Sequence, residues 1–152
     1  MWCRSSGTEG RIRVEREQVR VVREIPDAGD YAALRSQAGL SPRSEQGIRV
    51  GLGNSLFAVC LYAENELIGM GRVVGDGGCF LQIVDIAVRP DYQGQGLGRL
   101  VMDEIMAYLA REAPPEAYVS LIADQPADRL YLKYGFQYTA PASLGMYLRI
   151  SQ

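Results

Sequence analysis

The spacing of apolar residues changes several times along the chain between strand-like runs and a helical repeat, and this alternation predicts an α/β fold. Three apolar runs in the middle of the chain follow one another through short turns, which favours an antiparallel meander. We therefore expect a mixed, mostly antiparallel central sheet with flanking helices. The predicted strands are residues 19–25, 55–63, 67–74, 80–88, 117–123, 136–139 and 144–150, and the predicted helices are residues 26–38, 41–54, 97–113 and 124–135.

The run from Phe80 to Val88 is the predicted centre of this sheet. Its apolar residues occupy both faces of a strand, which is typical of a strand that is covered on both sides. Asp85 places a charge within the run. A helical repeat begins at Leu97 and a further strand is expected at residues 117–123, so this part of the chain predicts a right-handed βαβ unit.

A glycine-rich loop, Gln93–Arg99, joins the central strand to the helix that follows it. Glycine tolerates a positive φ, and a helix start has unpaired N–H groups and a positive dipole, so the loop predicts a cradle for a pyrophosphate. A Rossmann-type dinucleotide loop is excluded because Arg99 stands where that motif needs its third glycine. A Walker loop is excluded because Arg99-Leu100 replaces the required Lys followed by Ser or Thr. The alternative interpretation is a flexible connection without a ligand.

The loop also resembles the signature of the Gcn5-related N-acetyltransferase family, which is Gln or Arg, two residues, Gly, one residue, and Gly or Ala. Gln93, Gly96 and Gly98 occupy these positions. A second hallmark of the family resembles residues 124–136, where an Ala, a Tyr and a closing Gly-Phe fall in register. Asp124 stands where many relatives carry Asn, and we expect it to cap the helix there.

The resemblance covers residues 19–150 and implies the acyl-CoA N-acyltransferase fold. We expect a single acetyltransferase domain at residues 19–152. Residues 1–18 alternate Arg with Glu after a small polar start, so we expect them to form a disordered or solvated leader.

The resemblance implies acetyl-CoA as the co-substrate and implies no metal. The pyrophosphate is expected on the backbone of residues 95–99, and the pantetheine arm along the backbone of residues 86–88. The implied cofactor-binding residues are Ile86, Ala87, Val88, Gln93, Gly94, Gln95, Gly96, Leu97, Gly98, Arg99, Asp124, Ala127 and Tyr131.

Tyr131 is the expected general acid, because the family uses the matching tyrosine in that role. A phenol with an ordinary pKa of about 10 is protonated at neutral pH and can supply the proton that a departing thiolate needs. From the residues alone, the alternative is a core tyrosine, and Tyr134 is a competing phenol. For the general base we expect Asp85 or a water molecule, and the alternative for Asp85 is a structural, hydrogen-bonded aspartate.

Composition excludes several classes of function. The chain has no histidine, which removes Ser-His-Asp and Cys-His nucleophiles and most zinc sites. Its 16 basic and 18 acidic residues form no basic block, which argues against a nucleic-acid partner. Cys3, Cys60 and Cys79 fit neither a disulfide framework nor a metal site. No apolar run is long enough to span a bilayer, so we expect a cytoplasmic protein with no membrane partner.

Acceptor binding is expected at Tyr31 and at Arg43, which lies in the connection between the first two helices. We expect an acetyl-CoA-dependent N-acetyltransferase that transfers acetyl directly to a primary amine of a small molecule. The alternatives are a non-catalytic acyl-CoA sensor module and a protein lysine or N-terminal acetyltransferase. The sequence leaves open the identity of the amine and the choice between a monomer and a homodimer.

Overall fold

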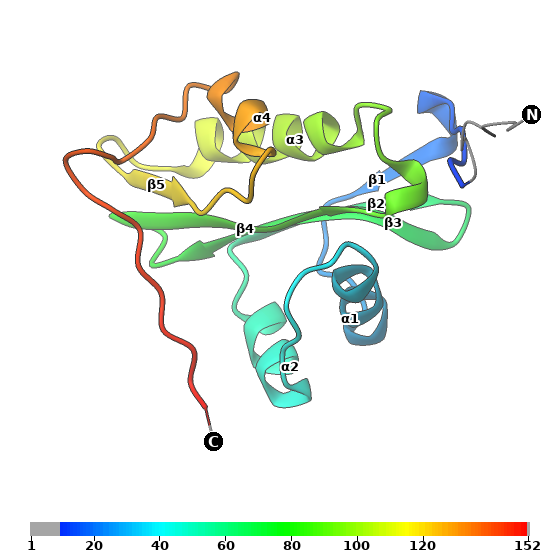
Figure 1. Cartoon of the computed structure of the whole chain (residues 1–152), viewed down its shortest axis with the longest axis horizontal. Helices are drawn as coiled ribbons and strands as arrows, with labels where there is room; N and C mark the ends of the chain where they lie inside the picture. Colours follow the sequence, from blue (N-terminus) through cyan, green and yellow to red (C-terminus); the bar gives the residue numbers. More distant parts are fainter. Residues whose placement is uncertain (1–9, 152) are drawn as a thin grey trace, which may run out of the picture. The chain divides into compact units, whose positions relative to one another are not determined.

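One five-stranded sheet organises the protein, and the computed structural model describes residues 10–151 of it. The strand order is β1-β2-β3-β4-β5, with antiparallel pairing from β1 to β4 (Figure 1). The Tyr118 N–H donates to the Cys79 carbonyl oxygen (2.8 Å), so β5 starts beside the start of β4. The expected fold class, a mixed and mostly antiparallel sheet with flanking helices, is confirmed. The strands are β1 (Val19–Val22), β2 (Phe57–Ala63), β3 (Glu66–Gly75), β4 (Phe80–Val88) and β5 (Tyr118–Leu121).

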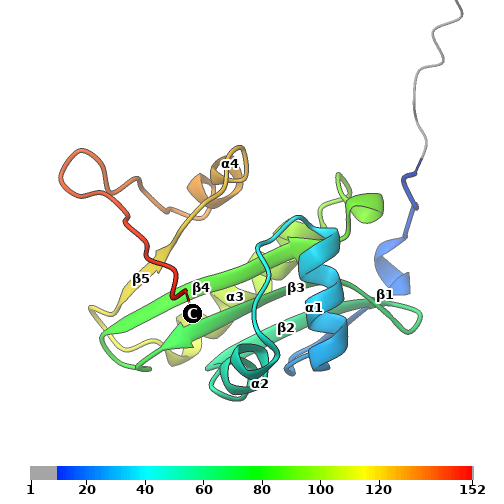
Figure 2. The ribbon, with the colours of Figure 1, turned by 60° about the horizontal axis from the view of Figure 1, so that its bottom comes forward.

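Helices cover both faces of this sheet. The helices α1 (Ala28–Gln37) and α2 (Glu45–Gly53) lie on one face, and α3 (Leu97–Glu112) lies on the other (Figures 1 and 2). Side chains cap the first two helices: Asp27 accepts a hydrogen bond from the Gly29 N–H (2.8 Å), and Ser44 accepts one from the Gly47 N–H (3.0 Å). These caps explain why α1 begins directly after Asp27 and α2 directly after Ser44.

The helix α3 approaches β3 closely at a glycine. A Cβ placed on Gly71 would lie 2.6 Å from Cγ1 of Val101 and 2.9 Å from Cδ1 of Ile105, so a larger residue would separate the helix from the sheet. Both side chains are fully buried. On the opposite face, Tyr31 and Leu34 of α1 pack in a second cluster of buried residues. The sheet is therefore covered on both sides, as the apolar pattern of β4 predicts.

Residue contacts divide the chain into two compact units, residues 1–120 and residues 121–152. The expectation of one acetyltransferase domain at residues 19–152 stays a prediction. Residues 1–9 of the expected leader lie outside the described residues. The remainder, residues 10–18, is largely exposed and includes the short 3-10 helix η1 (Arg16–Gln18).

In the second unit, the expected closing hairpin is wrong. None of the described residues from 136 to 151 forms a strand. Leu144, Met146 and Ile150 follow the predicted alternation, but these residues are between 76% and 90% exposed. The alternation specifies which side chains would share a face, whereas a strand also needs a partner for its backbone hydrogen bonds.

The expected cap of the last helix is also wrong. The helix α4 (Asp128–Leu132) has Ala127 rather than Asp124 at its N-cap. The Asp124 carbonyl oxygen accepts a hydrogen bond from the Ala127 N–H (2.8 Å), which places Asp124 in a turn before the helix. A residue that precedes proline is disfavoured in helical conformation, so the helix begins only after Pro126.

Candidate active site

The glycine loop leaves β4 through a short 3-10 helix, η2 (Pro90–Tyr92), and leads into α3. Gly94 and Gly96 have positive φ angles of 78° and 83°, and Gly96 is the N-cap of α3. A Cβ on Gly96 would have no atom within 4 Å, so the backbone is open on that side. Gln93 closes the loop by donating from Nε2 to the Val88 carbonyl oxygen (3.0 Å). The helix start, with N–H groups that lack intrahelical acceptors, suits a phosphate ligand.

The strand β4 is irregular directly before the expected pantetheine-binding residues. The pairing register with β3 shifts between Met70 and Arg72, and Asp85 has a φ of 60°. This bulge adds a residue to β4 and bends the strand there. Beyond it, Ala87 is buried opposite Met70, while Val88 pairs with Gly69.

Asp85 lies in a buried cluster of charged and aromatic side chains. Its Oδ1 accepts a hydrogen bond from Arg35 Nη1, and its Oδ2 accepts one from Arg72 Nε (2.8 Å) and one from the Tyr31 hydroxyl (2.6 Å). The side chains of Arg35, Asp85 and Arg72 are 6%, 8% and 10% exposed. Two guanidinium groups therefore surround one carboxylate in the interior.

Sequence reasoning missed both arginines of this cluster. Arg35 Nη2 also donates to the Ser41 carbonyl oxygen (2.6 Å), and Arg72 Nη1 donates to the carbonyl oxygen of Gly51 (3.0 Å) and to Ser55 Oγ (2.8 Å). They thereby tie the α1–α2 connection and the end of α2 to the sheet. A signal was present, because Arg72 is a charge within an apolar strand that neighbours the strand of Asp85.

The two predicted acceptor residues have different surroundings. Tyr31 is 3% exposed, and its pKa is raised by burial and then by its hydrogen bond to Asp85. Arg43 is exposed and donates to Ser41 Oγ (3.0 Å) and to the Pro42 carbonyl oxygen (3.0 Å). A cavity of about 330 Å³ lies beside α1 and α2, and its lining includes Ala32, Arg35, Gly39, Leu40, Arg43 and Ile48.

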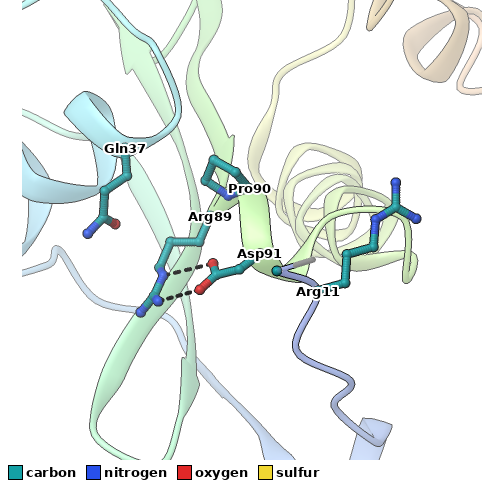
Figure 3. A pocket seen from close by; sticks show the side chains of 6 residues that line it. Arg11, Gln37, Arg89, Pro90 and Asp91 are labelled. Atoms are coloured by element: carbon teal, nitrogen blue, oxygen red, sulfur yellow. Dashed lines mark hydrogen bonds and ion pairs between the residues drawn. The ribbon is translucent and has the colours of Figure 1, made fainter. Parts of the chain in front are cut away.

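A larger cavity, of about 500 Å³, lies at the C-terminal end of α1 (Figure 3). It is lined by Gln37 of α1, by Gly10-Arg11 and by Arg89–Asp91. Arg89 forms ion pairs with Asp91 (2.6 Å) and with Glu66 (2.6 Å). This wall of the cavity is therefore occupied by paired charges.

Tyr131 lies in the second unit, together with Asp124 and Ala127. The residue is 8% exposed, and its ring meets Phe136 edge to face at 6.4 Å between centroids. Burial raises the pKa of Tyr131, and the charge of Asp124 raises it further. The phenol is therefore protonated at neutral pH, as a general acid requires.

Neither a metal cluster nor a membrane span is found in the part of the chain that the structure describes. Within residues 10–151, no group of three or more His, Cys, Asp or Glu side chains is arranged to hold a metal ion. No helix in the same residues is long and apolar enough to cross a membrane.

Comparison with known proteins identifies relatives of this chain. A family model described as an acetyltransferase (GNAT) domain matches residues 54–138. A "probable acetyltransferase" of unknown function from meticillin-resistant Staphylococcus aureus has a similar solved structure, with 53% identity and a TM-score of 0.84, covering 87% of this chain and 99% of that one.

Curated relatives agree with this result. The uncharacterized N-acetyltransferase ycf52 of Gracilaria tenuistipitata var. liui is 30% identical over 70% of this chain and 60% of its own length. The histone acetyltransferase TAP1 of Glycine max is 27% identical over 80% of this chain and 56% of its own length. The chain thus spans less than two thirds of either relative. Since the family model matches more than half of this chain, the chain belongs to the GNAT family of acetyltransferases.

Proposed function

We propose that this chain transfers the acetyl group of acetyl-CoA to a primary amine of a small molecule. The observation that carries the proposal is the glycine loop, in which Gly94 and Gly96 adopt positive φ angles directly before the start of α3. When bound, acetyl-CoA supplies an acetyl group activated as a thioester. The open backbone at Gly96 and the N–H groups of the first turn of α3 fit the phosphates of the CoA part of this molecule.

Tyr131 is the proposed proton donor. Its raised pKa keeps the phenol protonated at neutral pH, so it holds the proton that a leaving thiolate needs. Tyr131 is also well buried, which limits exchange of this proton with bulk water.

Asp85 is proposed as a positioning residue rather than as the general base. Its two carboxylate oxygens already accept hydrogen bonds from Tyr31, Arg35 and Arg72. The side chain is 8% exposed, so it offers little surface to an incoming ammonium group. Of the two bases expected from the sequence, we therefore favour a water molecule as the acceptor of the amine proton.

A small acceptor is supported by the cavity beside α1 and α2. Its volume of about 330 Å³ lies at the lower end of the range for small-molecule sites, which is roughly 300–1,000 Å³. Arg35 lines the cavity and also contacts Asp85, which directly precedes the expected pantetheine-binding residues.

The burial of Cys60 argues against an acyl-enzyme at this residue, which supports direct transfer. The residue is 1% exposed, and its thiol donates to the Glu24 carbonyl oxygen (3.4 Å) and has a pKa raised to about 11 by burial. A buried neutral thiol is a poor nucleophile.

The test measures release of the CoA thiol from acetyl-CoA in the presence of small amines, amino acids, polyamines, aminoglycosides and lysine peptides. We expect release with at least one small amine and identification of the N-acetyl product by mass spectrometry. Release only with lysine peptides would make the chain a protein acetyltransferase, the activity named for its Glycine max relative. Acetyl-CoA binding without release for any amine would support a sensor module instead.

A further inference from the structure

The segment Gly10–Arg16, which falls within the expected disordered or solvated leader, lies across the glycine loop. The Ile12 N–H donates to the Asp91 carbonyl oxygen (2.7 Å), and the Val14 N–H donates to Gln95 Oε1 (2.9 Å). Gln95 Nε2 donates in return to the Ile12 carbonyl oxygen (2.6 Å). The side-chain amide of Gln95 therefore binds the segment through both its donor and its acceptor.

This attachment brings the guanidinium of Arg11 to the loop. A Cβ placed on Gly94 would lie 3.2 Å from Arg11 Nη1, so the guanidinium group lies directly against the Gly94 backbone. Figure 3 shows the Arg11 side chain directed away from the ion pair between Arg89 and Asp91. Arg11 is thus placed beside the loop and is not turned toward the nearest carboxylate of the cavity wall.

Arg16 lies at a second opening on the same loop. A cavity of about 210 Å³ separates the segment from the first turns of α3, and Val14 and Arg16 form one wall of it. Gly96 and Arg99 contribute to the opposite wall. Asp103 is the acidic residue of the lining, which leaves an excess of positive charge around the start of the helix.

We propose that Gly10–Arg16 is an added wall of the donor site, in which Arg11 and Arg16 pair with the diphosphate of the acetyl donor. The proposal rests on the proposed function, which places acetyl-CoA at this loop. The backbone of the glycine loop supplies N–H donors and the start of α3 supplies a helix dipole, whereas a guanidinium adds a full charge and two parallel donors that match phosphate oxygens. The hydrogen bonds of Gln95 to Ile12 and Val14 hold the backbone between the two arginines before the donor arrives, which lowers the cost of ordering this segment on binding.

The experiment measures the dissociation constants of CoA and of dephospho-CoA by calorimetry for the full chain and for three variants. We expect Arg11→Gln and Arg16→Gln each to weaken binding of both ligands by about tenfold, because each loses a charge-assisted contact to the diphosphate. Arg13→Gln is the matched control: it removes an exposed arginine of the same segment that is not among the residues lining the 210 Å³ cavity, and we expect less than about a twofold change.

Four outcomes would overturn the proposal. Unchanged affinity of Arg11→Gln and Arg16→Gln would show that neither arginine contacts the donor. Tighter binding by these variants would show that the segment competes with the donor for the loop. An equal loss in Arg13→Gln assigns the effect to overall charge. A loss for CoA but not for dephospho-CoA moves the contact to the 3′-phosphate. Failure of the unaltered chain to bind either ligand contradicts the proposed function itself, and is thereby distinguished from failure of this inference.

Discussion

The Tyr31 hydroxyl donates a 2.6 Å hydrogen bond to Asp85 Oδ2, although 54 positions separate the two residues in the sequence. The guanidinium groups of Arg35 and Arg72 lie 5.6 Å and 5.5 Å from the centre of the Tyr31 ring and also bind the same carboxylate. From the sequence, Tyr31 was expected to bind the acceptor amine, and Asp85 or a water molecule was expected to accept the proton of that amine. Their contact joins α1 to β4 and makes Asp85 the counter-charge of two buried arginines.

Asp85→Asn should therefore destabilise the fold strongly. The substitution keeps the shape but leaves two buried guanidinium groups without a carboxylate, which costs about 3–5 kcal/mol of unfolding free energy. Urea unfolding followed by circular dichroism measures the change. Glu64→Gln, at an exposed turn, is the control and should stay within about 0.5 kcal/mol. A loss below about 1 kcal/mol in Asp85→Asn would contradict this account of the cluster.

The elements around the loop were predictable because local chemistry determines them. The strand β4 has the predicted bounds, Phe80–Val88, and α3 begins at Leu97 directly after the glycines. Both boundaries follow from a continuous apolar run and from a positive φ at Gly96. The family motif adds to these local signals, and membership of the family is confirmed.

The contacts that surround the loop were not predictable in the same way. Arg72 meets Asp85 only because β3 pairs with β4 in a register that includes a bulge, and no local spacing encodes such a bulge. The clamp between Gln95 and the segment around Ile12 joins residues 83 positions apart. The prediction of a closing hairpin was wrong because it relied on local spacing alone. Residues 144–150 have the alternation of a strand, but no strand in the described residues pairs with them.

Gly96→Leu should weaken CoA binding without unfolding the protein. A Cβ at this position meets no atom within 4 Å, so the new side chain projects into the opening where the phosphates are proposed to bind. The left-handed backbone, with a φ of 83°, costs a non-glycine residue roughly 1–2 kcal/mol. We expect at least about a tenfold rise in the dissociation constant by calorimetry.

Gly77→Leu provides the matched control for this strain. Gly77 has a φ of 76° in the turn between β3 and β4, and a Cβ there meets Leu56 only at an ordinary 3.8 Å. It should lose similar stability while binding CoA as the unaltered chain does. Equal affinities of Gly96→Leu and Gly77→Leu for CoA would place the phosphates elsewhere.

Cys60 should resist alkylation in the folded protein. Burial raises its pKa from 9.0 to about 11, so at pH 8 its thiolate fraction falls about a hundredfold relative to the unfolded chain. In a Cys3→Ser/Cys79→Ser background, iodoacetamide labelling should be at least that much slower in buffer than in guanidinium chloride. Labelling at similar rates would contradict a buried thiol. A thioacetyl group on Cys60 or, in the parent chain, on Cys79 during turnover would contradict direct transfer.

The raised pKa of Cys60 also predicts that the free energy of unfolding falls as the pH rises through the alkaline range. Between pH 9 and about 11 the unfolded chain ionises Cys60 while the folded chain keeps the neutral thiol, so unfolding becomes easier as the pH rises through this window. Below pH 9 both states hold the proton and this contribution is constant. In Cys60→Ala, the loss of stability across the window should be smaller than in the parent chain.

Tyr131→Phe should lower kcat while leaving the dissociation constant of CoA unchanged, because the variant keeps the ring that packs on Phe136 and loses only the acidic hydroxyl. General acid catalysis contributes about 10²–10⁴-fold, and we expect a loss in this range in thiol-release assays at neutral pH.

Its pH profile separates catalysis from packing. Burial and Asp124 raise the pKa of Tyr131 above its ordinary value of 10.0, so the phenol keeps its proton through the neutral and mildly alkaline range and kcat should not fall through deprotonation below about pH 10. Tyr134→Phe serves as the control and should retain kcat. A kcat that falls between pH 7 and 9 through deprotonation of an acid, or a Tyr131→Phe variant with unaltered kcat, would assign proton donation to another group.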